Sequence, residues 1–213
     1  MIVSRIVVGP LGTNCYIVKN EQTGKGFVVD PGSGAEKILA EIENLGVEIE
    51  YIFLTHAHFD HLLCIKEISD ATGAKLIFNK EDSELYAQGA GLVRHFFPDR
   101  VKSMLEHYYM TPYRLVTEGD TVNAGGLEVT FMNTPGHTGG SMFIFCEDIA
   151  FTGDTLLLGT VGRTDFDESR PFDMDDTLKK IKEIKGEYRV YPGHGELTTL
   201  AHEKSTNYYI YRA

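Results

Sequence analysis

The chain of 213 residues is poor in cysteine and in long apolar runs, and each shortage excludes a class of protein. Its three cysteines, Cys15, Cys64 and Cys146, are an odd number without paired spacing, which argues against a disulfide framework. No window approaches about 18 consecutive apolar residues, so we do not expect a membrane span. The N-terminal segment MIVSRIVVGPLG has neither a long apolar region nor a small-residue cleavage site. We therefore expect a cytoplasmic protein.

Basic residues are also scarce. Lysine and arginine number 20 against 31 aspartates and glutamates, which gives a formal net charge of -11. Because nucleic acid binding usually requires a basic stripe, we do not expect a nucleic acid partner. The hydrophobic content of 42% and the charged content of 24% are ordinary for a globular protein that buries a complete core. Composition leaves monomer and homodimer equally open.

The order of predicted elements indicates one domain over residues 1–213. Strand-like runs, helical segments, a second set of strands and a second set of helices follow one another. Two such halves favour two packed sheets with helices outside. Residues 85–114 contain several aromatic side chains without strand periodicity. We interpret this segment as an insertion of helix and loop near the functional site, with a possible role as a lid or an oligomer surface.

Metal-binding residue types are densest in THAHFDHLLC, residues 55–64, which holds three of the eight histidines. The preceding apolar run YIFL predicts a buried strand, and a helix is expected to start near Asp60. Imidazoles and a carboxylate that converge after a strand lose solvation unless a cation lies among them. The candidate ligands are His56, His58, Asp60 and His61. Cys64, about one turn into the expected helix, is interpreted as a packing residue.

Three later residues of the same types follow strand-like runs and lie beside glycine. They are His137 in NTPGHTGGS, Asp154 in AFTGDTL and His194 in VYPGHGE. Glycine allows the backbone to approach a site without a Cβ clash. The complete set exceeds the four ligands of a single tetrahedral zinc ion. It is suited to two divalent ions a few ångströms apart with one bridging carboxylate.

The ordered set HxHxDH, PGHT, GD and GHG resembles the metallo-β-lactamase superfamily. The early segments LGTNCYIV (11–18) and VVDPG (28–32) also match, so the resemblance covers essentially the whole chain. It implies an α+β fold, a four-layer αββα sandwich with the metals at one edge of the two sheets. The segments GTVGRTDF (159–166) and GHGELTTLAHEKSTN (193–207) are similar to the short glyoxalase II-like hydroxyacylglutathione hydrolases.

The resemblance also implies roles for individual residues. The first ion would be held by His56, His58 and His137, the second by Asp60, His61 and His194, and both by Asp154 as the bridge. Zinc is the expected metal, with iron and manganese as alternatives. Asp60 would also orient the attacking hydroxide. Asp30 matches a position behind the metals that supports a histidine; from the residues alone, a turn aspartate before Pro31 is an equal interpretation.

Hydrolysis is the expected reaction, because two adjacent cations lower the pKa of a shared water and create a bridging hydroxide. Asp154 stands where the best-known zinc β-lactamases carry cysteine, which argues against a β-lactamase. The resemblance implies a thioester hydrolase acting on a small acyl-thiol, such as a 2-hydroxyacyl thioester. One alternative is a persulfide dioxygenase with a single iron on His56, His137 and Asp154. Another is a hydrolase of the same fold that cleaves a lactone or a phosphodiester.

Some features leave the natural thiol open. Two-domain glyoxalase II proteins continue into a helical region that binds glutathione, whereas this chain ends 19 residues after His194. Leu62, Leu63 and Cys64 stand where relatives often have glycines. Arg163 is a candidate contact for a substrate carboxylate, with an ion pair to a nearby aspartate as an equal alternative. The acidic run TDFDESRPFDMDD (164–176) is interpreted as a solvated loop followed by a helix start.

Overall fold

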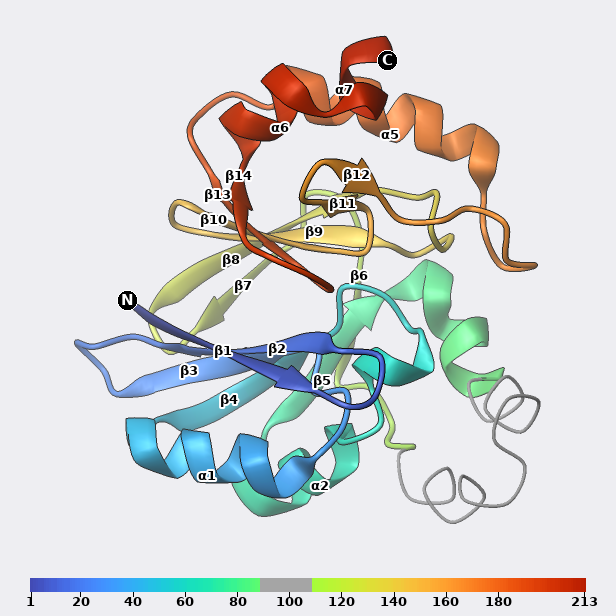
Figure 1. Ribbon diagram of the computed structural model, residues 1–213. Helices are drawn as coiled ribbons and strands as arrows, with labels where there is room; N and C mark the ends of the chain where they lie inside the picture. The colour runs from blue at the N-terminus through green and yellow to red at the C-terminus, as the bar shows by residue number, and fades with distance from the viewer. Residues whose placement is uncertain (89–108) are drawn as a thin grey trace.

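The computed structural model describes residues 1–88 and 109–213, in which two six-stranded sheets face each other (Figure 1). The first sheet has the order β1 (Ile2–Val8), β2 (Thr13–Lys19), β3 (Lys25–Val29), β4 (Glu48–Phe53), β5 (Lys75–Asn79) and β6 (Arg114–Val116). The second has the order β14 (Thr198–Thr199), β13 (Arg189–Pro192), β10 (Ile149–Gly153), β9 (Met142–Cys146), β8 (Leu127–Asn133) and β7 (Thr121–Ala124). A small hairpin of β11 (Leu156–Leu157) and β12 (Thr160–Val161) follows β10.

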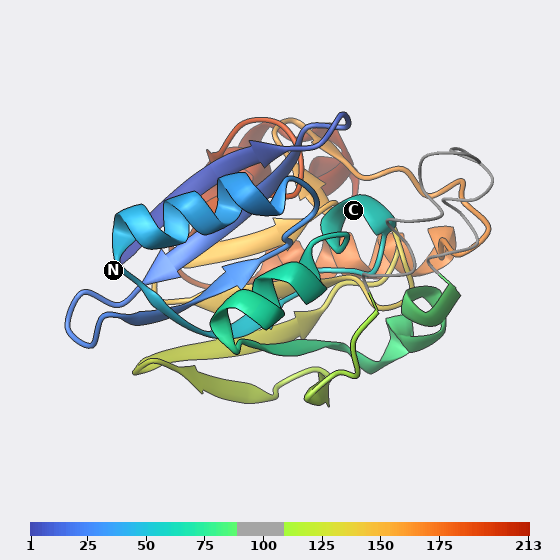
Figure 2. The same ribbon diagram turned by 90° about the horizontal axis from the view of Figure 1, so that it is seen from below.

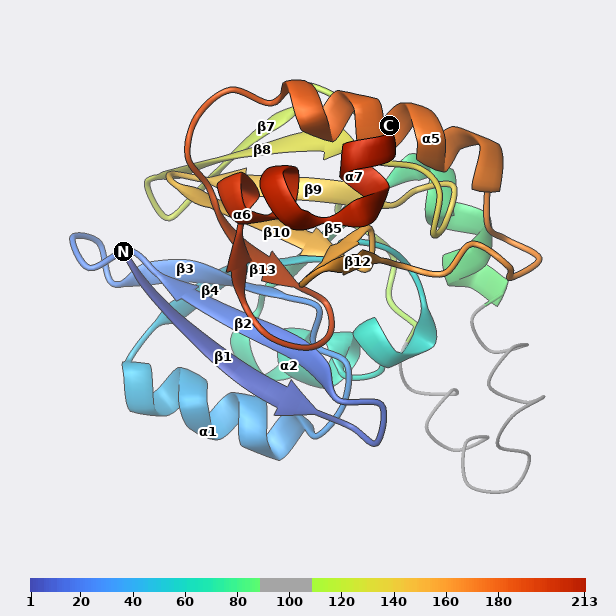
Figure 3. The same ribbon diagram turned by 45° about the horizontal axis from the view of Figure 1, so that its top comes forward.

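Helices cover the outer face of each sheet. The first sheet is covered by α1 (Ala35–Leu45) and α2 (Ile65–Thr72), which lie below it in Figure 1 and in front of it in Figure 2. The second is covered by α5 (Pro171–Glu183), α6 (Leu200–Thr206) and α7 (Tyr208–Arg212), which Figure 3 shows from above. The predicted αββα sandwich of the α+β class is confirmed.

Three apolar layers hold the sandwich together, and they explain why the central strands are apolar throughout. In β2, Cys15 and Ile17 pack in the layer between the first sheet and helices α1 and α2. The alternate residues Tyr16 and Val18 face the second sheet. A third layer lies between the second sheet and α5, α6 and α7. Because both faces of the central strands are buried, these segments lack the polar alternation of a strand with one wet face.

Parallel pairing brings the functional segments to one edge. The strands β3, β4, β5 and β6 are parallel neighbours, and β10 is parallel to β13 in the other sheet. The carboxyl ends of parallel strands meet at the same edge, so the residues after β3, β4, β10 and β13 converge. Thr55 lies within this edge, where its carbonyl accepts a hydrogen bond from Met142 N of the opposite sheet at 3.0 Å.

The segment after β4 differs from the sequence prediction. A short 3-10 helix, η1 (Phe59–His61), precedes α2, and α2 begins at Ile65 rather than near Asp60. Cys64 precedes the helix, and its backbone N–H donates to Pro31 O at 3.0 Å, an acceptor outside the helix. The side chain is buried in the layer beneath the first sheet, as expected of a packing residue.

Most of the predicted insertion at residues 85–114 lies outside the described residues, which stop at 88 and resume at 109. Of its ends, residues 83–88 are helical and residues 114–116 form β6. Tyr86 OH donates to Met110 O at 2.8 Å and joins the two ends. Within the part of the chain that the structure describes, no helix is both long and apolar enough to cross a membrane.

Candidate metal centre

All seven candidate ligands lie at the shared edge of the two sheets, each just after a strand or in η1. In chain order they are His56, His58, Asp60, His61, His137, Asp154 and His194. Two groups each bring three ligand atoms within 4.8 Å of one another. We name them site 1 (His56, His58, His137) and site 2 (Asp60, His61, His194). The same criterion groups Asp30 with His56 and His61.

Asp30 anchors one histidine of each site. Its Oδ2 accepts hydrogen bonds from Thr55 Oγ1 at 2.6 Å and from His61 Nδ1 at 2.9 Å, and its Oδ1 accepts from Thr55 N at 2.8 Å. Because the single hydroxyl proton of Thr55 is donated to Asp30, Thr55 Oγ1 accepts from His56 Nδ1 at 3.1 Å. In its neutral form each of these histidines therefore carries its proton on Nδ1 and presents a bare Nε2, the arrangement expected of a carboxylate behind a metal-bound histidine.

The other two histidines of site 1 are held by the segment after β12. His137 Nδ1 donates to the carbonyl of Arg163 at 2.8 Å, so its Nε2 is bare. His58 Nε2 lies 2.8 Å from Glu168 Oε1, so its Nδ1 is the nitrogen that faces site 1. The ring of Phe166 packs between these contacts, with its centroid 5.3 Å from that of His58 and 6.0 Å from that of His137.

Unpartnered nitrogens support a metal in this cluster. Among the described residues, buried side-chain atoms without a hydrogen-bond partner include His56 Nε2, His61 Nε2 and His137 Nε2. A buried polar atom without a partner is costly, and here three lone pairs face the same space. A divalent cation in each site would satisfy them, so the residues present fit the metal ions that the sequence predicts.

Site 2 has a different composition. Asp60 Oδ2 accepts from Thr13 Oγ1 at 2.7 Å and lies 3.2 Å from His194 Nε2 and 3.5 Å from His61 Nε2. His194 Nδ1 lies 2.9 Å from Asp154 Oδ1, so both nitrogens of this ring face carboxylates. The site is also more open, since the His194 side chain is 25% exposed.

Asp154 lies between the two sites. Its Oδ2 is 3.6 Å from His137 Nε2 of site 1 and 3.8 Å from His61 Nε2 of site 2. Gly193 makes this approach possible, because a Cβ there would collide with Asp154 Oδ1 and lie 2.8 Å from His61 Cε1. Asp154 is thus within reach of both groups of histidines, and its role as a bridge stays a prediction.

His56 and His137 of site 1 are neutral at pH 7. Burial lowers the pKa of His56 well below its usual range, and the neighbouring histidines act in the same direction. Burial, together with His58, lowers the pKa of His137 to about 4. These rings are therefore already deprotonated for metal binding.

The histidines of site 2 behave in the opposite way. Burial would lower the pKa of His61, but the carboxylates of Asp60, Asp30 and Asp154 outweigh it and raise that pKa to about 9. At His194, burial is likewise outweighed by Asp154 and Asp60, and the pKa is raised to about 10. The same contacts lower the pKa values of Asp60 and Asp154 even though burial opposes this. His61 and His194 of site 2 therefore hold an additional proton at pH 7, whereas His56 and His137 of site 1 hold none.

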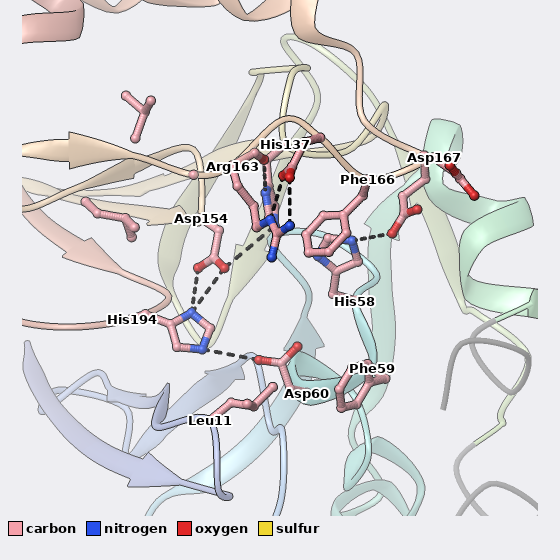
Figure 4. A pocket seen from close by; sticks show the side chains of 15 residues that line it. Leu11, His58, Phe59, Asp60, His137, Asp154, Arg163, Phe166, Asp167 and His194 are labelled. Atoms are coloured by element: carbon pink, nitrogen blue, oxygen red, sulfur yellow. Dashed lines mark hydrogen bonds and ion pairs between the residues drawn. The ribbon is translucent and has the colours of Figure 1, made fainter. Parts of the chain in front are cut away.

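A pocket of about 640 Å³ opens onto both sites. Figure 4 shows its walls, with Asp154, His194 and Asp60 on one side and Phe166 beside His58 on the other. Its apolar lining comprises Leu11, Phe59, Leu157, Val161 and Phe166, and its acidic lining outside the two sites comprises Asp165, Asp167 and Glu168. A small molecule in this pocket would therefore contact apolar surface on its way to the candidate ligands.

Arg163 also lines the pocket, and its side chain is already engaged. Its Nε and Nη2 donate to the two carboxylate oxygens of Asp165 at 2.6 and 2.8 Å. The guanidinium carbon lies 4.2 Å from the ring centroid of Phe166. The ion pair to an aspartate, one of the two sequence interpretations, is therefore present.

Sequence reasoning missed two carboxylates of this centre. The acidic run 164–176 was expected to be a solvated loop, which is wrong for Glu168, because this side chain is 19% exposed and bonded to His58. Asp82 is 2% exposed and binds the loops on either side of site 1. Both are distant in sequence from the histidines they support, so spacing could not reveal them.

Comparison with known proteins places these motifs in a family. The family model of the metallo-beta-lactamase superfamily matches residues 8–194. A probable metallo-hydrolase of Streptococcus pyogenes is 32% identical over 92% of this chain and 84% of its own length. The hydroxyacylglutathione hydrolase GloC of Haemophilus influenzae is 28% identical over 99% of this chain and 98% of its own length.

A solved structure extends the likeness to the fold. The crystal structure of TTHA1623 in a di-iron-bound form has a TM-score of 0.83 and 31% identity. The match covers 97% of this chain and 99% of that one. With its two sheets, its ordered ligand motifs and a matching model over residues 8–194, the chain belongs to the metallo-β-lactamase superfamily.

Proposed function

We propose that this protein is a dinuclear metal-dependent hydrolase that cleaves a thioester of a small acyl-thiol. The observation that carries the proposal is the position of Asp154 Oδ2, within 4 Å of an unpartnered histidine nitrogen from each site. A carboxylate placed in this way suits two ions better than one. The name of the Haemophilus influenzae relative, a hydroxyacylglutathione hydrolase, supports a thioester as the substrate class.

Each ligand would serve one ion or both. His56, His58 and His137 would hold the first, Asp60, His61 and His194 the second, and Asp154 would contact both. We propose zinc, with iron or manganese as alternatives, since a relative binds two irons. When bound, such a pair supplies a nucleophilic hydroxide near neutral pH and polarises a carbonyl group.

The protein side chains position the reactants. Asp60, fixed by Thr13 Oγ1, would hold and orient the attacking water at the mouth of site 2. Leu11, Phe59 and Phe166 form the apolar wall against which the acyl or thiol group would pack and exclude bulk water. A thiolate is a good leaving group, so the reaction requires no strong general acid.

Arg163 is our candidate contact for a substrate carboxylate. The guanidinium lies at the pocket, and a substrate would have to compete with Asp165 for it. Exposed ion pairs of this kind are weak in water, so the exchange costs little. Replacement by glutamine (Arg163→Gln) should raise KM for a carboxylate-bearing thioester and leave KM for a neutral thioester unchanged. An equal change for both substrates would assign Arg163 to loop support alone.

One experiment tests the proposed reaction directly. Metal content of the purified protein is measured by elemental analysis, and thiol release from a 2-hydroxyacyl thioester is followed in the same sample. We expect about two divalent ions per chain and thioester turnover that a chelator abolishes and added metal restores. Turnover of a lactone or a phosphodiester in place of the thioester would reassign the substrate class within the same fold.

A persulfide dioxygenase is the second candidate. It requires one iron, which His56, His137 and Asp154 would hold, and His137 Nε2 lies 3.6 Å from Asp154 Oδ2. A relative with 31% identity binds iron, which keeps iron among the expected metals, but that relative binds two ions and not one. One iron per chain, with oxygen consumption on a thiol persulfide and no thioester cleavage, would replace the hydrolase proposal.

A further inference from the structure

Asp82 connects the two loops that carry the histidines of site 1. It ends the 3-10 helix η2 (Lys80–Asp82), which follows β5. Its Oδ2 accepts from the backbone N–H of Ala57, the residue between His56 and His58, at 2.9 Å. Its Oδ1 accepts from Gly140 N at 2.6 Å in the loop after His137.

A third bond completes the connection. Thr138 Oγ1, next to His137, lies 2.9 Å from Asp82 Oδ2. Gly140 is shaped to this carboxylate, since a Cβ there would lie 2.6 Å from Asp82 Cγ and Oδ1. Asn79 fixes the turn that presents Asp82, because its side chain accepts from Glu81 N at 3.1 Å. The carboxylate is thus held in position to accept hydrogen bonds from both loops.

We propose that Asp82 is a positioning residue that sets the spacing of the histidines in site 1 and thereby its metal affinity. It acts through the backbones on either side of the site and not by contact with the ion. The inference rests on the proposed assignment of site 1 to a metal. Asp82 lies in neither group of candidate ligands, so its substitution would leave every ligand atom in the chain.

The sharpest variant is Asp82→Asn, which keeps the shape but replaces one acceptor oxygen with an NH₂ donor. The two carboxylate oxygens each face a backbone N–H, from Ala57 and from Gly140. Whichever way the amide turns, a donor meets a donor. We expect the affinity of site 1 to fall by about 10- to 100-fold and that of site 2 to stay unchanged.

Glu203→Gln is the matched control. Glu203 is fully buried and also accepts three hydrogen bonds, from Gly159 N, Thr198 Oγ1 and Asn207 Nδ2. If Asp82→Asn does not fold, the same measurements are made on Thr138→Val, which removes one of the three hydrogen bonds to Asp82. Near-ultraviolet circular dichroism identifies the folded variants.

Two measurements decide the proposal. Chelator competition with cobalt(II) gives the affinity and the optical spectrum of each site. The spectral bands are assigned with two variants, His58→Ala, which lacks a ligand of site 1, and Asp60→Ala, which lacks a ligand of site 2. Hydrogen exchange of metal-free protein reports on the amides of Ala57 and Gly140. Faster exchange at both amides, with loss of the site 1 spectrum in Asp82→Asn and not in Glu203→Gln, supports the proposal.

Results that contradict the role of Asp82 can be distinguished from results that contradict the proposed function. Wild-type protein that binds two ions, with Asp82→Asn indistinguishable from Glu203→Gln in exchange and in both affinities, would overturn the role of Asp82 alone. Wild-type protein that binds no second ion would overturn the dinuclear proposal, and the exchange of the two amides would still test the connection between the loops.

Discussion

The two candidate sites share an edge of the sandwich but differ in charge and in exposure. Site 1 consists of three histidines, with exposures of 2% for His56, 8% for His58 and 3% for His137. Site 2 combines two histidines with Asp60, and its His194 side chain is 25% exposed. Hydrogen bonds to oxygens outside the cluster hold site 1. In site 2, Asp30 and Thr13 hold His61 and Asp60 from outside, but His194 bonds to Asp60 and Asp154 within the cluster.

This difference indicates which site can bind a metal at neutral pH without first losing protons. Lowered pKa values keep His56 and His137 neutral, so a cation in site 1 would meet the bare Nε2 atoms of these two rings. In site 2, protons on His61 and His194 neutralise the carboxylates in place of a metal. We therefore expect site 1 to fill first, and site 2 to fill only as protons leave.

The largest expected effect comes from removing one ligand of each site. His58→Ala should empty site 1, and Asp60→Ala should empty site 2, so metal content should fall in each from about two ions per chain to about one. Thioester turnover should fall by about 100-fold or more in both variants, because the proposed reaction requires both ions. Near-normal turnover in either variant would contradict the two-metal mechanism.

Next in size is the pH dependence, which should separate the sites. The pKa values of about 9 for His61 and about 10 for His194 mean that both rings are protonated in metal-free protein below pH 9. A metal must displace both protons, so the affinity of site 2 should fall by about 100-fold for each pH unit below 9 and level off above 10.

His56 and His137 should add no such dependence above about pH 5, because their pKa values are already lowered. Calorimetry in buffers of different ionisation enthalpy measures the protons released with each ion. Equal release from the two sites would show that they do not differ in protonation.

The sequence predicted that these residues come together because strand topology places them, and their role as ligands stays a prediction. Each candidate ligand of the first motif follows β4, and Asp154 and His194 follow the parallel pair β10 and β13, so convergence needs only the rule that strand ends meet. The resemblance to the superfamily then assigned the residues to two groups, and the same groups lie within 4.8 Å in the structure.

The supporting residues could not be predicted in this way. Glu168 bonds to a histidine 110 positions away, and Asp82 binds loops 25 and 58 positions away. No periodicity or spacing encodes such contacts, because they depend on how the two sheets pack. The prediction that the helix starts near Asp60 was wrong for a similar reason. The Cys64 N–H bonds to Pro31 O and not to a carbonyl of η1, so α2 begins at Ile65.

A moderate effect is expected from Asp30→Asn. The Asp30 side chain is almost fully buried and accepts three hydrogen bonds, and its backbone φ of 51° is unusual for a residue with a side chain. An amide NH₂ facing Thr55 N would oppose a fixed donor, so it should turn toward His61 Nδ1. In the neutral His61 ring the single proton would then lie on Nε2, where the metal is expected.

We predict that Asp30→Asn lowers the affinity of site 2 by about 10- to 100-fold. Chelator competition measures this loss, and proton resonances of the His61 ring show which nitrogen is protonated. A wild-type tautomer with reduced affinity would assign the loss to backbone strain instead.

The smallest effect should come from Glu168→Gln, which tests whether charge or orientation matters in site 1. The glutamine oxygen can still accept from His58 Nε2, so Nδ1 keeps facing the site and only the negative charge is lost. Because the Glu168 side chain is partly exposed, solvent screens that charge, and the affinity of site 1 should fall by less than about 10-fold. Asp167→Asn removes the same charge from the same pocket lining and serves as the control. If Asp167→Asn weakens metal binding at site 1 equally, the overall charge of the pocket sets the affinity of that site. If only Glu168→Gln weakens it, the charge of the carboxylate bonded to His58 sets the affinity.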